Sequence, residues 1–250
     1  MVSVSGPAFP GTKSVDFLHG WRTPSGDHMA GIRIILEDGW KTYWRTPQGS
    51  GIPPILSVAS TPGIDAVKLI YPRPAVYEEF GAEVLGYTGS VTFPIEFDLS
   101  NGATDISFTG EFRFAVCKDV CIPLLLNIAT ELHADQASHA SIIKAALAER
   151  PKSPSRHGIR KTHCDVSPTA SGVGYQAKLR WPADQRVEKI VVEYPSDAVW
   201  VAPVENEITG SELSVTANIT NYASGTVFLQ RDSFRLSILT QTAIFEFEGC

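Results

Sequence analysis

Two of the four cysteines lie four positions apart, in the stretch EFRFAVCKDVCIPLLLN that runs from Glu111 to Asn127. Four cysteines in 250 residues is far below the density of small domains that need disulfides to fold. A disulfide between Cys117 and Cys121 would close a short loop and remove little entropy from the unfolded chain. The pair is therefore better suited to reversible thiol–disulfide exchange than to stabilising a fold.

The residues around the pair predict how the backbone could bring the two sulfurs together. In one extended strand, four residue steps would separate the Cα atoms by roughly 13 Å, which is too far for a disulfide. A hairpin that turns at 118–120 places Cys117 opposite Cys121 and Val116 opposite Ile122. Because side chains alternate between faces, this register turns the even-numbered apolar residues toward the core. We expect the cysteines together on the other face.

Three interpretations of the pair remain open from these residues: redox exchange, a structural surface disulfide and a Cu(I) site. Lys118 would favour the thiolate that exchange requires, whereas Asp119 would oppose it. Two thiolates could hold Cu(I), but zinc normally needs four ligands. His133 and His163 stand alone rather than at metal-ligand spacing. We therefore predict no resident metal or other cofactor.

The elements that must position the cysteines are predicted to be strands. Apolar segments of strand length follow one another up to about Leu132, separated by Gly, Pro, Asn and Asp and without long helical periodicity. Such close spacing indicates antiparallel sandwiches rather than a doubly wound sheet. One short helix is expected in ASHASIIKAALAER, which ends before Pro151.

The sequence thus predicts an all-β protein with two immunoglobulin-like antiparallel β-sandwich domains. We expect a first domain over residues 1–134, a helix and a Pro-, Ser- and Lys/Arg-rich linker over 135–164, and a second, smaller sandwich over 165–250. Cys164 and Cys250 bracket the second domain, and the sequence leaves open whether they are bonded or free.

Composition excludes several classes of function. With 43% hydrophobic residues, 19% charged residues and a net charge of −6, the chain is typical of a globular protein without the basic surface that nucleic acids require. No apolar run reaches the roughly 20 residues of a membrane span, and the start MVSVSGPAFPG shows no signal peptide. Phosphate-binding glycine loops, GxSxG and HExxH are absent, which argues against nucleotide enzymes and hydrolases.

Three motifs resemble the periplasmic N-terminal region of bacterial transmembrane thiol:disulfide interchange reductases (DsbD/ScsB-like), especially the copper-tolerance branch. They are VCKDVCIP at 116–123, GWKTYWR at 39–45 and GIPP at 51–54. The resemblance implies an immunoglobulin-like periplasmic domain whose cysteine pair cycles between dithiol and disulfide. It also implies that Cys121 forms the mixed disulfide with partners and that Cys117 resolves it.

The resemblance further implies a cap over the cysteines. The family shields its pair with a loop that carries an aromatic residue, and Glu78-Glu79-Phe80-Gly81 resembles this loop. Phe80 would lie over the sulfurs, with Glu78 and Glu79 raising the pKa of the thiols; an ordinary core position is the alternative for Phe80. Three nearby aromatic residues are expected either in the sandwich core or on a partner surface around the cysteines: Trp40, Tyr43 and Trp44.

The expected partners also follow from the resemblance. A membrane-embedded or thioredoxin-like donor would supply two electrons, and oxidised periplasmic proteins would receive them, in cytochrome biogenesis or copper tolerance. The sequence contains no transmembrane segment and no Cys-x-x-Cys module, so we expect a separate donor. The alternatives are a non-enzymatic module that handles Cu(I) through the same thiols and a structural interaction domain.

Overall fold

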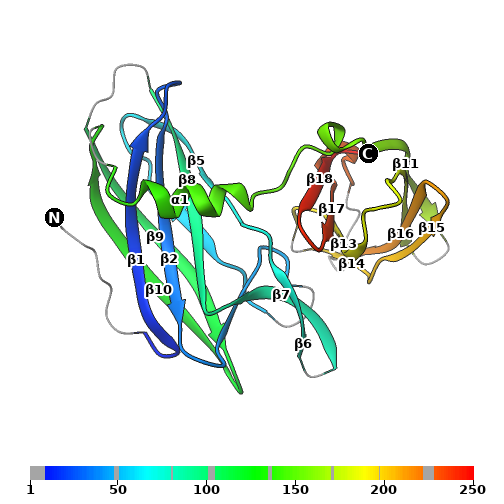
Figure 1. Ribbon diagram of the computed structural model, residues 1–250, viewed down its shortest axis with the longest axis horizontal. Coiled ribbons are helices and arrows are strands. Elements are labelled where there is room, and N and C mark those ends of the chain that lie inside the picture. Colours follow the sequence, from blue (N-terminus) through cyan, green and yellow to red (C-terminus); the bar gives the residue numbers. More distant parts are fainter. Residues whose placement is uncertain are drawn as a thin grey trace. The chain divides into compact units, whose positions relative to one another are not determined.

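The computed structural model contains antiparallel sheets, one α-helix and two 3₁₀ turns within the residues that it describes (Figure 1). The prediction of an all-β sandwich protein is confirmed. The chain divides into two compact units, Met1–Arg150 and Pro151–Cys250. The described residues are 9–47, 51–79, 81–100, 105–134, 137–169, 172–196, 198–221 and 228–250.

Two sheets form the first unit. One has the strand order β1 (Thr12–Arg22), β2 (His28–Leu36), β8 (Ser90–Leu99), β5 (Ile64–Leu69). The other has the order β10 (Cys121–Leu132), β9 (Ile106–Cys117), β3 (Lys41–Tyr43), β7 (Ala82–Thr88), β6 (Ala75–Glu79), and β4 (Ile55–Val58) pairs with β9 beyond the end of β3.

Alternating side chains of β8 and β9 hold these two sheets together. Phe97 of β8 meets Phe108 of β9 edge to face, with ring centroids 4.8 Å apart, and Phe93 lies 5.9 Å from Phe112. All four rings are fully buried. Aromatic rings bury the largest apolar areas of any side chains and gain further from edge-to-face contact, so this cluster orients β9 with its even-numbered residues inward.

Helix α1 (Ala140–Ala148) packs on the first sheet, across β1 and β8 (Figure 1). Its Ile143 is fully buried. A Cβ atom at Gly31 would come within 3.3 Å of the Ile143 side chain, so glycine there makes room for the helix. A Cβ atom at Gly20 would clash with the Met29 carbonyl oxygen, so glycine there is required by the close approach of β2. The helix is therefore part of the first unit.

The second unit is a smaller sandwich of two sheets. One has the order β11 (Arg160–Thr169), β12 (Gly172–Arg180), β16 (Glu212–Asn221), β14 (Val199–Val201), with β15 (Glu205–Thr209) also paired with β16. The other has the order β13 (Val187–Glu193), β17 (Arg235–Thr240), β18 (Ile244–Glu248). The 3₁₀ turns are η1 (Pro154–His157) and η2 (Arg231–Ser233).

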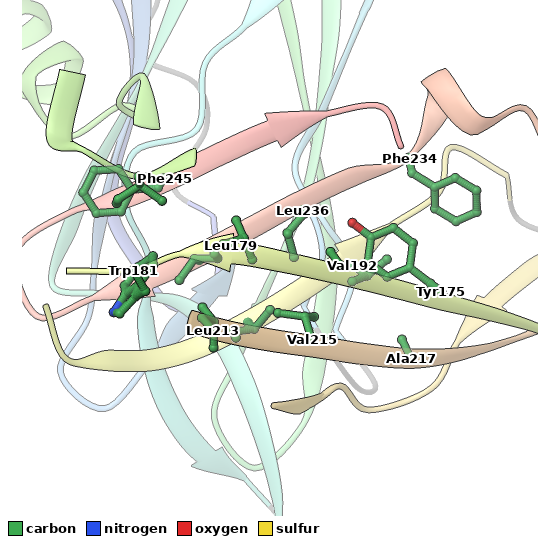
Figure 2. Close-up of a cluster of buried hydrophobic side chains, with 14 of the residues drawn as sticks. Tyr175, Leu179, Trp181, Val192, Leu213, Val215, Ala217, Phe234, Leu236 and Phe245 are labelled. Atoms are coloured by element: carbon green, nitrogen blue, oxygen red, sulfur yellow. The ribbon is translucent and has the colours of Figure 1, made fainter. Parts of the chain in front are cut away.

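The core of the second unit comes from alternating residues of facing strands (Figure 2). Tyr175 and Leu179 of β12 point inward, and Leu213 and Val215 of the neighbouring strand β16 belong to the same buried cluster. Trp181, directly after β12, is buried against Phe245 with ring centroids 6.1 Å apart, and its indole N–H donates to the Gln185 carbonyl.

The segment predicted as helix and linker, 135–164, is divided between the two units. Its helix packs on the first unit, whereas strand β11 begins at Arg160 and includes Cys164. Cys164 is bonded to Cys250, with Cα atoms 5.1 Å apart. The basic and proline-rich composition suggested a linker. Lys and Arg on an edge strand keep their charged ends in water, so an edge strand and a solvated linker have similar compositions.

We expect the Cys164–Cys250 disulfide to stabilise the second unit. It joins positions separated by 86 residues, and closing so long a loop removes much of the entropy of the unfolded chain. Cys164→Ser should lower the free energy of unfolding of this unit by about 2–5 kcal/mol, measured by urea denaturation of the full chain. Cys250→Ser is the matched control and should cost the same. A loss below about 0.5 kcal/mol in both variants would contradict this role.

Candidate functional site

Strands β9 and β10 form the hairpin that carries the two cysteines. Cys117 pairs with Cys121, Val116 with Ile122, and the same register continues to Ile106 and Leu132. The predicted register is confirmed. A disulfide joins the cysteines, whose Cα atoms are 4.2 Å apart. Because the even-numbered residues of β9 fill the core, the disulfide lies on the opposite face of the sheet.

The two cysteines differ sharply in exposure. Cys121 begins the edge strand β10 and is exposed, whereas Cys117 is only 1% exposed. Cys117 lies between β10 and β3, where it packs in a small cluster with Tyr43 and Val84 and, at its margin, Tyr77. This cluster lies on the face of the sheet away from the main core. It leaves Cys121 as the sulfur that a visiting molecule meets first.

A chain of polar contacts leads from Cys121 into the protein. The Tyr43 hydroxyl lies 3.4 Å from the Cys121 Sγ and donates a hydrogen bond of 3.2 Å to the Glu79 Oε2. The Glu79 Oε1 lies 2.9 Å from the Lys41 Nζ. Tyr43 and Glu79 are both buried, and the Lys41 side chain is 19% exposed. The Tyr43 hydroxyl thus links the buried Glu79 carboxylate to the Cys121 Sγ.

Strand periodicity explains why these groups meet. Lys41 pairs directly with Cys117, and Tyr43 follows two residues later on the same face of β3. On β6, Tyr77 and Glu79 take this face as well, through the pairing of β6 with β7 and of β7 with β3. The β6–β7 hairpin therefore supplies the buried carboxylate.

Electrostatics at Tyr43 follow from this burial. Desolvation, then the negative charge of Glu79 and the hydrogen bond to it, raise the pKa of Tyr43 to about 12. The hydroxyl therefore keeps its proton at neutral pH and directs it at the Glu79 Oε2 in the hydrogen bond. A lone pair of the Tyr43 oxygen is then left facing the Cys121 Sγ. This arrangement can accept a hydrogen bond from a Cys121 thiol.

The residues predicted to form the cap differ in burial and in the face of β6 that they occupy. Glu79 is buried at the end of β6, within the contact chain to Cys121. Glu78 is exposed, since it points to the other face of β6. Phe80 lies outside the described residues. The segment turns at Gly81, whose φ of 78° favours glycine.

The three aromatic residues near the GIPP motif also lie in different environments. Trp44 is fully buried, as expected for a core residue, and Trp40 is partly buried. Tyr43 is buried in the cluster around Cys117 rather than in the main core. The sequence interpretation missed Lys41 and the role of Tyr43. Their spacing of two residues marks one face of a strand, but only the pairing of that strand with β9 shows that the cysteines share the face.

Within the described part of the chain, no group of three or more His, Cys, Asp and Glu side chains is arranged to hold a metal ion. None of the helices there is long and apolar enough to cross a membrane.

Known proteins resemble this chain in sequence and in fold. The profile of the family described as "Thiol:disulfide interchange protein DsbD, N-terminal" matches residues 14–129. The fold resembles the crystal structure of the N-terminal periplasmic domain of ScsB from Proteus mirabilis, with a TM-score of 0.67, 18% sequence identity, and coverage of 98% of this chain and 94% of that one. No curated protein sequence matches.

The family match covers the strands that build the site, from β1 into β10. It includes Cys117, Cys121 and the three residues of the contact chain, whereas the structural likeness extends over both units and concerns the fold. Residues 14–129 of the first unit therefore match the family of DsbD N-terminal domains of thiol:disulfide interchange proteins.

Proposed function

We propose that this protein is a periplasmic thiol–disulfide exchange module that passes electrons through Cys117 and Cys121 to oxidised proteins. The family match supports thiol–disulfide interchange in the periplasm. The observation that carries the proposal is the disulfide at the end of the β9–β10 hairpin, with one sulfur exposed and its partner buried. A thioredoxin-like or membrane-embedded protein is the proposed donor.

The exchange proceeds in two balanced steps. In the reduced module, the Cys121 thiolate attacks one sulfur of a substrate disulfide, forming a mixed disulfide and releasing one substrate thiolate. The Cys117 thiolate then attacks the Cys121 Sγ, which reforms the Cys117–Cys121 disulfide and releases the second substrate thiolate. Two electrons pass to the substrate, and its two thiolates take up protons from solvent. Reduction by a donor dithiol runs the same steps in reverse.

The difference in exposure supports different roles for the two sulfurs in this scheme. A partner sulfur must approach in line with the bond that breaks, and only Cys121 is open to such an approach. Cys117 needs no access to partners, because its target is the Cys121 Sγ beside it. Cys121 is thus the proposed nucleophile and Cys117 the resolving thiol.

Glu79 is the proposed pKa-tuning residue. Its negative charge, transmitted through the Tyr43 hydroxyl, favours the neutral thiol over the thiolate at Cys121. A thiol is oxidised more slowly than a thiolate by small oxidants, so the reduced pair would hold its electrons until a protein partner arrives. Lys41 holds Glu79 in place and partly offsets its charge. Exposed Glu78 is screened by water and contributes little.

The reduction potential tests the function itself. Structural disulfides of secreted proteins typically lie below about −300 mV, and exchange-active disulfides lie above this value. We expect the Cys117–Cys121 pair above about −300 mV in dithiothreitol redox buffers, with the Cys164–Cys250 pair as an internal reference below it. A value for Cys117–Cys121 as low as that of the reference would identify an inert bridge.

Alkylation tests the assignment of the nucleophile. In Cys117→Ser the remaining thiol of the pair is exposed, whereas in Cys121→Ser it is buried among Tyr43 and Val84. Iodoacetamide should therefore modify Cys121 at least about tenfold faster than Cys117 at the same pH. Equal rates, or faster modification of Cys117, would reverse the assignment.

The pH profile of alkylation tests Glu79. In a Cys117→Ser background, Glu79→Gln removes the negative charge that opposes the thiolate and leaves Lys41 to favour it. The pKa of Cys121 should fall, which moves the alkylation profile to lower pH. Glu78→Gln removes the same charge from the neighbouring exposed position and should leave the profile unchanged. An unshifted profile in Glu79→Gln would show that the contact chain does not tune the thiol.

A further inference from the structure

We propose that Lys41 is the counter-charge for the resolving cysteine: its ammonium group stabilises the Cys117 thiolate while Cys117 attacks the mixed disulfide. This inference rests on the proposed function and deepens it, because it names the residue that activates the buried sulfur. The role is distinct from holding Glu79 in place, since here the charge of Lys41 acts on a reacting atom.

The burial of Cys117 makes its thiolate costly to form. Cys117 is only 1% exposed and packs against Tyr43 and Val84. In such surroundings a thiolate loses the water that would solvate its charge, so burial favours the neutral thiol. The thiolate is nevertheless the form that attacks a disulfide. A resolving cysteine at this position therefore needs a positive charge close by.

Strand register places Lys41 directly beside Cys117. Lys41 is paired with Cys117 on one side and Cys121 on the other, so the three residues form a row across β3, β9 and β10. Directly opposed residues of antiparallel strands share a face, and their Cβ atoms lie about 4.5–5.5 Å apart. Lys41 is thus one strand away from Cys117 but two strands, or about 9–10 Å, away from Cys121. Its charge acts more strongly on Cys117.

The buried carboxylate of Glu79 increases the need for this charge. In the oxidised protein, the charges of Glu79 and Lys41 cancel in an ion pair of 2.9 Å. A thiolate at Cys117 gives this shielded group one net negative charge, and without Lys41 the net negative charge would be twice as large. Repulsion between like charges is strong where water does not screen them. Lys41 therefore lowers the free energy of the Cys117 thiolate.

Lys118, the neighbour of Cys117 in sequence, is less suited to this role. It is exposed, and its ammonium group lies by the turn at Gly39, where an added Cβ atom would be 3.3 Å from the Lys118 Nζ. From there its charge contributes to lowering the pKa of Asp38. Water and salt screen an exposed charge, whereas the side chain of Lys41 is largely shielded. The shielded cation is the one that affects the buried sulfur.

The activated step balances in atoms and charge. The Cys117 thiol loses its proton to solvent, and Lys41 stabilises the thiolate that remains. This thiolate attacks the Cys121 Sγ, which forms the Cys117–Cys121 bond and breaks the bond between Cys121 and the substrate sulfur. The substrate leaves as a thiolate and takes up a proton from solvent. The charges of Lys41 and Glu79 then cancel again, as they do in the disulfide-bonded structure.

A neutral disulfide reagent separates the two exchange steps. The full chain, reduced at Cys117–Cys121, is mixed with dithiodipyridine, and the release of thiopyridone is followed by stopped-flow absorbance. A first phase proportional to reagent concentration reports attack by Cys121, and a second phase independent of concentration reports resolution by Cys117. Lys41→Met should slow the second phase at least about tenfold at neutral pH and move its pH profile to higher pH, because the thiolate loses its counter-charge. Lys41→Arg should recover at least about threefold of this loss.

A second comparison shows whether Lys41 acts on the sulfur itself or only through Glu79. In a Glu79→Gln background, Lys41→Met removes the second half of the ion pair and leaves no unpaired buried charge, so the chain should stay folded. The second phase should still slow, and by a larger factor than the first, because Cys117 is nearer to Lys41 than Cys121 is. Lys118→Met is the matched control. It removes the same charge from an exposed position and should leave both phases within about twofold of wild type.

Three results would overturn the proposal: an unchanged second phase in Lys41→Met, equal slowing of both phases in the Glu79→Gln background, or no recovery in Lys41→Arg. Failure of the proposed function gives a different result. A wild-type chain without a second phase, or with one that depends on reagent concentration, would show that Cys117 does not resolve the mixed disulfide.

Discussion

The antiparallel register of β9 and β10 is the constraint on which the site depends. It places Cys117 opposite Cys121 and, through the same alternation, sends the phenylalanines of β9 into the core. A shift by one residue would turn the sulfurs toward the sandwich core and the rings away from it, at a cost of about 1.5–3 kcal/mol for each large apolar side chain moved into water. The core thereby holds the disulfide on the opposite face of the sheet.

The surroundings of the disulfide make its two sulfurs unequal. Strand β3 and the β6–β7 hairpin cover Cys117 with Tyr43 and Val84, whereas Cys121 lies on the edge strand. Beneath them, Glu79 and Lys41 form a shielded ion pair. Such a pair adds little net stability, because desolvation of both charges offsets their attraction. Its position next to a disulfide therefore supports a role in tuning the sulfur chemistry.

The two disulfides differ in the length of chain that each one closes, and this length decides how much a disulfide stabilises the fold. The Cys117–Cys121 bond spans four residues of a hairpin that the core already orders, so breaking it costs the fold little. The Cys164–Cys250 bond ties the first strand of the second unit to the end of the chain across 86 residues. A bond that can open and close without unfolding the protein suits exchange, and a bond over a long loop suits stabilisation.

The sequence by itself determined the all-β class, the short helix before Pro151 and the hairpin register, because period-two alternation and the cysteine spacing are local properties. It also pointed to Glu79 through the resemblance of the segment 78–81 to a family loop. Only the tertiary structure decided that Glu79 rather than Glu78 faces the sulfurs, that Lys41 and Tyr43 join them, and that Cys164 is bonded to Cys250. Each of these depends on which distant strands pair, and the free energy of such pairing cannot be obtained from any single segment of the sequence.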